Sequence, residues 1–156
     1  WRATLMKLRL VKLRLADLQL VARAWSDLIL IDRRLSHEGL DPLLVRIELE
    51  AAPPREVSRE HLRLARRYAR RIALAAHICP VGARCLHRSL VLHMWLRRQG
   101  LPSRLRFGVW KAEGDLRAHA WVELAGVPVN DDRRALQGIS PMTSPRRVDR
   151  EAAYDL

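Results

Sequence analysis

The sequence predicts an α+β fold, with helices in the first part of the chain and an antiparallel sheet after them. Two patterns indicate this. Up to about residue 98, apolar side chains recur three and four positions apart, as in amphipathic helices. After Gly100, apolar and polar residues alternate, as in strands with one buried face. Helices followed by strands are typical of an α+β arrangement and not of alternating βαβ units.

The length of the chain fits one domain. A chain of 156 residues, 49% of them hydrophobic and 29% charged, can bury one sizeable core and is typical of globular proteins. We therefore expect a single domain over residues 1–156. It comprises a helical part at 1–80, a cysteine-bearing helix with a sheet at 81–135, and a polar, turn-rich tail at 136–156 that is only loosely docked.

Caps and helix breakers predict four helices. Gly39 ends the first, and Asp41 followed by Pro42 is typical of an N-cap with a first-turn proline. Ser58 can cap the third helix, and Gly100 lies where a left-handed cap would follow the fourth. The expected helices span residues 15–36, 42–50, 59–76 and 84–98. The first fifteen residues, which include "LMKLRLVKLRL", fit either a helix or an edge strand.

Alternation predicts an antiparallel sheet of at least three strands. The segments "SRLRFGVWK" and "AHAWVELA" both alternate, and "VPVND" follows a turn at Gly126. The last two of these segments should therefore form a hairpin.

The chain is strongly basic, with 29 Lys and Arg against 17 Asp and Glu and a formal net charge of +12. This charge predicts an acidic partner, and nucleic acid, an anionic membrane surface and an acidic peptide all qualify. Much of the charge lies on one face of the third expected helix. That face is either a solvated surface or a contact for acidic residues or phosphates. Its arginines are Arg59, Arg63, Arg66, Arg67 and Arg70.

Two cysteines, Cys79 and Cys85, lie six positions apart. A disulfide across so short a loop can form, but two cysteines are too few for a secreted disulfide scaffold, and their spacing fits no zinc module. We therefore expect a reducing cytoplasm. The basic N-terminal segment has no unbroken apolar core, so we expect neither a signal peptide nor a membrane span. The sequence has no metal-ligand cluster or phosphate-binding loop, which predicts no metal and no cofactor.

Cys85 lies where the fourth helix should begin. A helix N-terminus favours a thiolate, and its free N–H groups can stabilise an oxyanion. The alternative is that Cys85 is a small buried side chain that only packs, as we expect for Cys79.

A nucleophilic cysteine also needs a base and a group that orients it. His119 opens one strand, and Asp131 and Asp132 follow the strand that should return beside it. A three-residue turn would pair position 119 with 131, and a two-residue turn would pair it with 132. The sequence leaves this choice open.

At these residues the sequence resembles a known family, the transglutaminase-like cysteine peptidases that remove leader peptides in lasso-peptide biosynthesis. The resemblance is close over about 84–132 and is weaker in the helical first half. The shared pattern is a Cys-Leu-x-x-Ser-Leu helix, a Leu-x-x-x-Gly loop, a strand ending in Gly-Val, then Ala-His-Ala-Trp-Val-Glu and an Asp after the next strand. Here these are Cys85, Leu86, Ser89 and Leu90; Leu96 and Gly100; Gly108 and Val109; Ala118 to Glu123; and Asp131.

The resemblance implies a transglutaminase- or papain-like core with Cys85 as nucleophile, His119 as base and acid, and Asp131 as the orienting group. It also implies the reaction, which is hydrolysis of the bond between the leader and the core of a precursor peptide. Papain-like enzymes often supply a glutamine to the oxyanion, but no glutamine lies between Gln19 and Gln99. The backbone N–H of Cys85 with a neighbouring amide, or else Arg84 or Arg88, would take that role.

The resemblance implies partners as well: the precursor peptide, a separate leader-recognition protein, and an ATP-dependent cyclase of asparagine-synthetase type. The recognition protein should be separate because residues 1–80 predict helices and not the winged-helix domain that some members carry. Nucleic acid and a membrane span are not expected. The candidate residues for binding substrate or partner are Arg63, Arg67, Arg84, Arg88 and Trp121.

Two other functions fit parts of the sequence. A transglutaminase-like enzyme could transfer acyl groups to amines or deamidate glutamine with the same three residues. A basic nucleic-acid-binding or scaffold module would use the arginines for phosphates and Cys85 for packing. Aromatic residues make up only 5% of this sequence, and those on the expected strands do not form a stacking platform for bases. This disfavours the nucleic-acid-binding alternative.

Overall fold

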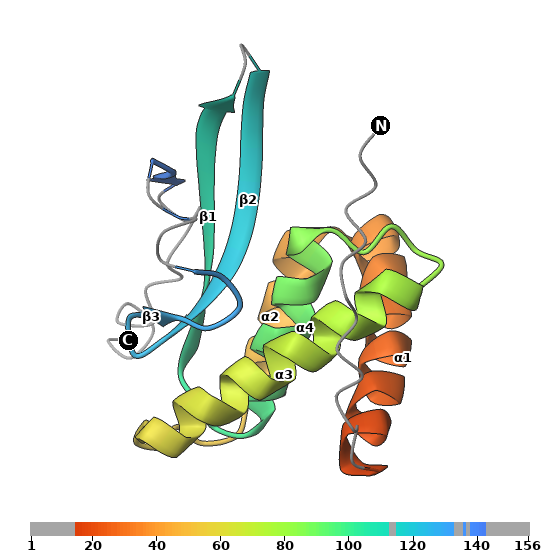
Figure 1. The fold of residues 1–156 in the computed structure, drawn as a ribbon, viewed down its shortest axis with the longest axis vertical. Helices are drawn as coiled ribbons and strands as arrows, with labels where there is room; N and C mark the ends of the chain where they lie inside the picture. The colour runs from red at the N-terminus through yellow and green to blue at the C-terminus, as the bar shows by residue number, and fades with distance from the viewer. Residues whose placement is uncertain (1–14, 113–114, 133–135, 137, 143–156) are drawn as a thin grey trace, which may run out of the picture.

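The computed structural model of the chain describes residues 15–112, 115–132, 136 and 138–142. Four helices precede a four-stranded antiparallel sheet, as the sequence predicts for an α+β fold (Figure 1). The helices are α1 (Leu15–Glu38), α2 (Leu40–Leu49), α3 (Arg59–Ile78) and α4 (Cys85–Arg98). The strands are β1 (Ser103–Ala112), β2 (Asp115–Leu124), β3 (Val127–Pro128) and β4 (Ser140–Met142). No described helix is both long and apolar enough to cross a membrane.

The helix ends follow the caps in the sequence, with one exception. Ser58 caps α3 in a capping box whose second member is His61, and Gly100 takes the left-handed conformation after α4, with φ +73°. The prediction that Asp41 is the N-cap of α2 is wrong. Gly39 occupies that position with φ +83°, because the chain turns sharply there and α2 starts immediately after it at Leu40.

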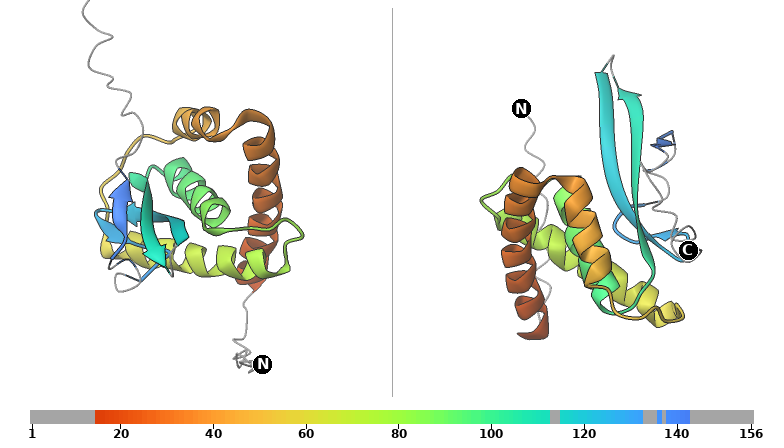
Figure 2. Two further views of the ribbon diagram at one scale, coloured as in Figure 1. Left: turned by 90° about the horizontal axis from the view of Figure 1, so that it is seen from above. Right: turned by 180° about the vertical axis from the view of Figure 1, so that it is seen from behind.

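Helix α4 lies at the centre of the molecule. Its residues 89–96 are all buried, and it contacts the other three helices as well as β1 and β2 (Figure 2). Close packing on all sides holds such a helix in one position. The N-terminal end of α4, where Cys85 lies, is therefore carried on a rigid element.

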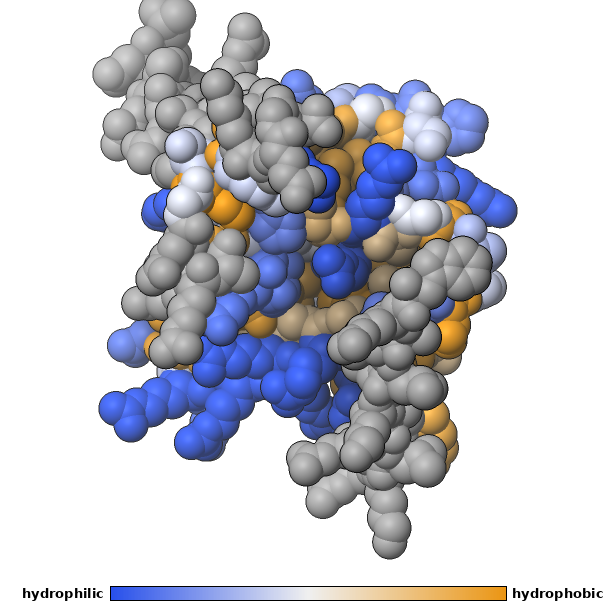
Figure 3. Space-filling model, turned by 45° about the horizontal axis from the view of Figure 1, so that its top comes forward, coloured by the Kyte–Doolittle hydropathy of each residue, from blue (hydrophilic) through white to orange (hydrophobic). Residues whose placement is uncertain are grey.

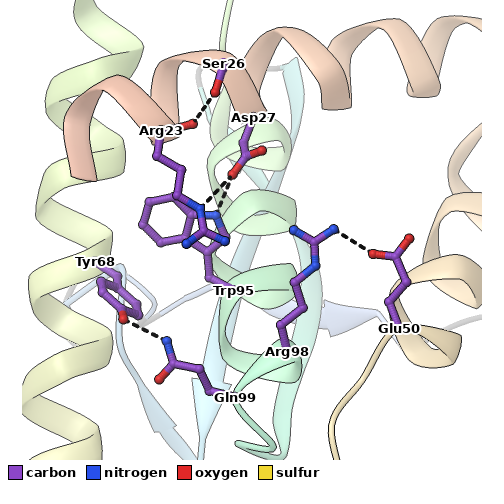
Figure 4. Close-up of polar contacts among 8 residues, drawn as sticks. All are labelled: Arg23, Ser26, Asp27, Glu50, Tyr68, Trp95, Arg98 and Gln99. Atoms are coloured by element: carbon purple, nitrogen blue, oxygen red, sulfur yellow. Dashed lines mark hydrogen bonds and ion pairs between the residues drawn. The ribbon is translucent and has the colours of Figure 1, made fainter. Parts of the chain in front are cut away.

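Polar contacts fix the far end of α4 among the helices. The Nε1 of Trp95 donates a hydrogen bond to Asp27 of α1 over 2.7 Å, and the ring of Tyr68 of α3 meets the Trp95 ring edge-on at 5.1 Å (Figure 4). Gln99 donates to the Tyr68 hydroxyl over 2.7 Å. These bonds join α1, α3 and α4 around one aromatic ring.

The sheet has the order β3-β2-β1-β4. The expected tail contains an edge strand that the sequence did not predict, because Ser140 to Met142 pair with Phe107 to Val109 of β1. The segment "SPM" has no alternation, and a proline is compatible with a strand only at the edge of a sheet, which is where Pro141 lies. The prediction of a loosely docked tail is wrong for these residues. Residues 143–156, and the ambiguous segment 1–14, lie outside the described residues.

Asp17, in the first turn of α1, connects that helix to α3. It is buried and accepts hydrogen bonds from Nε and Nη2 of Arg67 over 3.0 and 2.8 Å, while the Arg71 guanidinium lies 3.1 Å away. The guanidinium groups of Arg71 and Arg67 lower the pKa of Asp17 from 3.8 to about 2. Because the folded state holds this carboxylate ionised, its contacts with the two arginines stabilise the fold fully at pH values above the pKa of Asp17 in the unfolded chain. This stabilisation is lost as the pH falls through the lower pKa of Asp17 in the folded protein.

We expect the Asp17→Asn variant to unfold at a lower temperature than the wild type at about pH 6. The difference should shrink as the pH is lowered from about 4 to about 2, because the wild-type carboxyl becomes protonated over that range. Thermal unfolding of both proteins followed by circular dichroism across these pH values measures the difference. A difference that stays constant over the whole series would contradict the role given to this carboxylate.

Candidate active site

The structure brings His119 and Asp131 into direct contact. The Nε2 of His119 lies 2.9 Å from an Oδ of Asp131, and both side chains are half-buried. His119 is in β2, and Asp131 follows β3 in the chain. A carboxylate on Nε2 favours the tautomer with its proton there, which leaves Nδ1 with a lone pair that can take a proton.

Turn length does not decide which aspartate bonds to His119. The β2–β3 hairpin has a two-residue turn at Ala125 and Gly126, both with positive φ, so its register would extrapolate to His119 opposite Asp132. The pairing does not extend that far. After the Val129 N–H bonds to Val122, the side chain of Asn130, and not a backbone carbonyl, accepts the next ladder bond from Val122.

This replacement ends the ladder before the aspartates. Asp131 is thereby free of the strand register and turns its carboxylate to His119. The expectation that turn length selects the aspartate is therefore wrong. Of the two aspartates that the hairpin offered, it is Asp131 that bonds to the histidine.

Two tryptophans surround the His119 ring. Trp121 is stacked on it, with ring centroids 6.3 Å apart and planes at 19°, and Trp110 of β1 meets it edge-on at 6.2 Å. Trp121 is itself held by a 3.2 Å bond from its Nε1 to Glu123. Gly108, the cross-strand partner of His119, leaves room for this packing, since a Cβ there would lie 3.1 Å from the Trp121 ring and 2.3 Å from Ile139. The histidine is thus held in one orientation from both sides.

Cys85 is the first residue of α4 and is a half-buried free thiol. Arg84 is the N-cap, and its side chain makes no capping bond to the N–H groups of the first turn. No hydrogen bond joins Cys85 to His119, both of which the structure describes. Of the three residues predicted to act together, the structure joins His119 and Asp131 directly.

Ser89 connects the helix of Cys85 to the His119–Asp131 pair. It lies one turn after Cys85 on the same helix face and is fully buried. Its hydroxyl donates to the Ala120 carbonyl and accepts from Asn130 Nδ2, both over 2.9 Å. Ala120 and Asn130 are the chain neighbours of His119 and Asp131, so one hydroxyl docks this face of α4 beside both members of the pair. Sequence reasoning placed Ser89 in a motif but gave it no role, and it missed Asn130.

We expect Ser89→Ala to lower the free energy of unfolding by about 1–3 kcal/mol, because it leaves the buried Ala120 carbonyl and the half-buried Asn130 amide without their partner. Urea unfolding measures this change. The matched control is Ser26→Ala, whose exposed hydroxyl donates to the Arg23 carbonyl within α1. If Ser89→Ala costs no more than Ser26→Ala, the contact does not hold α4 to the sheet.

The five predicted binding residues lie in different environments. Arg63 and Arg84 are exposed, and Arg67 is bound to Asp17. The Nε of Arg88 is buried without a hydrogen-bond partner among the described residues. Trp121 is buried against His119. A charge reversal at Arg67 would therefore act first on the contact between α1 and α3, and exposed arginines are better probes of partner binding.

In the described part of the chain, no group of three or more His, Cys, Asp or Glu side chains could hold a metal ion. His87 and His93, which lie on different faces of α4, have separate partners. His87 lies 3.1 Å from Asp32, and His93 is 2.9 Å from the Ser103 hydroxyl and 3.5 Å from Glu48.

Comparison with known proteins identifies the family. The sequence profile of the transglutaminase-like superfamily matches residues 27–144, well over half of the chain. The chain belongs to the transglutaminase-like superfamily. The match covers the second half of α1, all of α2–α4 and the four strands. No curated protein and no solved structure matches the chain.

Members of the transglutaminase-like superfamily are typically enzymes that act through a cysteine. The order of elements in this chain, four helices and then an antiparallel sheet, is consistent with such a domain. The match supports a cysteine-based, papain-like enzyme. It does not extend to the substrate or to the reaction type.

Proposed function

We propose that the chain is a cysteine peptidase that removes the leader from a lasso-peptide precursor, with Cys85, His119 and Asp131 as its catalytic triad. The observation that carries the proposal is the 2.9 Å contact between His119 and Asp131 in a chain of the transglutaminase-like superfamily. A histidine with a bonded carboxylate is the part of a triad that activates a nucleophile. Cys85, at the start of the central helix, is the nucleophile that we assign to it.

The reaction that we propose is acyl transfer through a thioester. The Nδ1 of His119 takes the thiol proton, and the Cys85 sulfur bonds to the carbonyl carbon between leader and core. When the carbon–nitrogen bond breaks, the imidazolium gives its proton to the leaving amine. His119 then takes a proton from water, whose oxygen bonds to the thioester carbon. The carbon–sulfur bond breaks, the leader leaves as a carboxylic acid that loses its proton to solvent, and the Cys85 thiolate recovers its proton from the imidazolium. Asp131 stabilises the imidazolium and fixes its orientation.

The first turn of α4 supplies the oxyanion hole in this proposal. Its N–H groups point out of the helix end and are not capped by the side chain of Arg84, and the helix dipole is positive there. The N–H of Cys85 and a neighbouring amide are therefore the donors that we favour over the side chains of Arg84 and Arg88.

We place the activity in a sequence of steps with three partners. These are the precursor peptide, a separate leader-recognition protein, and an ATP-dependent cyclase of asparagine-synthetase type, which would use the α-amine that cleavage frees. The support is the motif from Cys85 to Asp131, which resembles the leader peptidases of this pathway. We expect the enzyme to act in the cytoplasm.

Incubating the chain with a lasso precursor peptide and the recognition protein tests the proposal by mass spectrometry. We expect two fragments whose masses sum to the precursor plus one water. Release of ammonia from an intact chain, or a cross-link to an added amine, would instead assign the site to glutamine deamidation or acyl transfer. An unchanged precursor in the presence of its recognition protein would contradict peptidase activity.

A further inference from the structure

A groove of about 490 Å³ lies between α3 and the segment 129–132. Arg66, Ala69, Arg70 and Ala73 form the α3 wall. Their spacing of three and four puts them on one face of the helix. The two alanines are half-buried, and their small side chains leave the groove open. The longer side chains of the two arginines border it.

The groove adjoins the proposed catalytic site. Its wall opposite α3 includes Asp131, whose carboxylate bonds to His119. A chain that lies in the groove therefore passes beside the carboxylate that orients the proposed base.

The two arginines of the groove are exposed and have no acidic partner within ion-pair distance among the described residues. They differ in this from Arg67 and Arg71 on the next face of the helix, which hold Asp17. Figure 3 shows strongly hydrophilic side chains gathered at the lower left of the molecule, in the region where Figure 1 places the first half of α3. Arg66 and Arg70 can therefore form ion pairs with the carboxylates of a ligand without breaking a contact of the fold.

We propose that this groove binds an acidic stretch of the peptide substrate, with Arg66 and Arg70 pairing its carboxylate side chains. The proposal rests on the proposed function, because it assigns the groove to the substrate of the same site. Arg66 and Arg70 are then specificity-determining residues, and the substrate class is a peptide with Asp or Glu beside the cleaved bond.

A peptide fits the groove better than a nucleic acid does. A nucleic acid carries a charge at every nucleotide, so some of its phosphates would lie against the carboxylate of Asp131 on the wall opposite the arginines, whereas a peptide can place its few carboxylates at the arginines and its neutral backbone at that wall. A peptide brings N–H groups for that wall as well as carboxylates for the arginines. The proximity to His119 gives a bound peptide a reacting partner.

Binding of a fluorescently labelled hexapeptide with two glutamates, and of the same peptide with glutamines instead, tests the proposal by anisotropy. The protein is the full chain carrying Cys85→Ala, so that binding is measured without turnover. We expect the glutamate peptide to bind about three- to tenfold more tightly, as two exposed ion pairs would give. Raising the salt concentration should reduce this preference.

The decisive variant is Arg66→Gln with Arg70→Gln, and its control is Arg33→Gln with Arg104→Gln. The control pair removes the same charge from exposed positions on α1 and β1. We expect the first pair to abolish the preference for glutamate and the control pair to keep it. Circular dichroism of both proteins establishes that they are folded to the same extent.

Three results would overturn the proposal. The first is a preference for glutamate that survives in the Arg66 and Arg70 variant, and the second is an equal loss in the control. The third is a single-stranded oligonucleotide that binds more tightly than the glutamate peptide and depends on the same two arginines. These results are separable from failure of the proposed function. A preference for glutamate without any cleavage of a precursor refutes the peptidase alone, and cleavage that ignores acidic residues and Arg66 and Arg70 refutes the groove alone.

Discussion

Replacing Cys85 with alanine is expected to reduce precursor cleavage at least about 10³-fold, because the variant has no sulfur to form the thioester. His119→Ala should cause a loss of similar size. The double variant should be no worse than either single one, since the two residues act as a unit. Initial rates of precursor cleavage, measured by chromatography with the recognition protein present, give these comparisons.

Cys79 provides the control within the same molecule. It is also a half-buried free cysteine, but it is the C-cap of α3 and packs against the core. Cys79→Ala should therefore cleave at the wild-type rate. Equal loss in the Cys79 and Cys85 variants would mean that both act through stability, and wild-type cleavage by Cys85→Ala would remove Cys85 from the mechanism.

Replacing Asp131 with asparagine is expected to reduce cleavage by up to about 10⁴-fold, the loss that follows when the carboxylate of a Ser-His-Asp triad becomes an amide. An amide can donate its own N–H to Nε2, which would put the ring proton on Nδ1 and remove the lone pair that takes the thiol proton. The shape of the side chain barely changes. The loss should therefore appear in kcat, with unfolding by urea little affected.

Asp132→Asn is the matched control for this experiment. It makes the same chemical change one residue further along the chain, at the position that hairpin register alone would place opposite His119. We expect it to retain most of the activity. A larger loss at Asp132 than at Asp131 would mean that the 2.9 Å contact of His119 is not the one used in the reaction.

Local signals predicted most of the fold. The period of the apolar residues placed all four helices, and Ser58, Gly39 and Gly100 marked helix ends in the way their cap preferences require. Alternation located β1 and β2, and Gly126 located the turn after them. Each of these features depends on side chains within a few positions of one another.

The remainder depends on contacts between distant segments. The strand β4 forms because it pairs with β1, and its three-residue sequence has no alternation that would predict a strand. Asp17 and Arg67 lie fifty positions apart, so a stripe of arginines gave no sign of which one was already paired.

The same reason limits what the sequence shows of the site. It offered Cys85, His119 and two aspartates, and the structure joins His119 to Asp131 through a change in the ladder at Asn130. An asparagine that replaces a backbone acceptor leaves no periodic signal. The Ser89 contact that docks α4 is likewise a tertiary feature, visible only when the helix and the sheet are placed together.

The most direct test of the central claim, that Cys85 is activated by the His119–Asp131 pair, is the rate at which iodoacetamide alkylates each cysteine. Intact-protein mass spectrometry with peptide mapping separates Cys85 from Cys79, and the reaction is run at about pH 6, where an ordinary thiol is almost fully protonated. We expect one fast modification, on Cys85, that slows at least about tenfold in His119→Ala while Cys79 is unaffected. Equal slow rates at both cysteines, or a Cys85 rate that does not change without His119 when the recognition protein and precursor are also present, would contradict the claim.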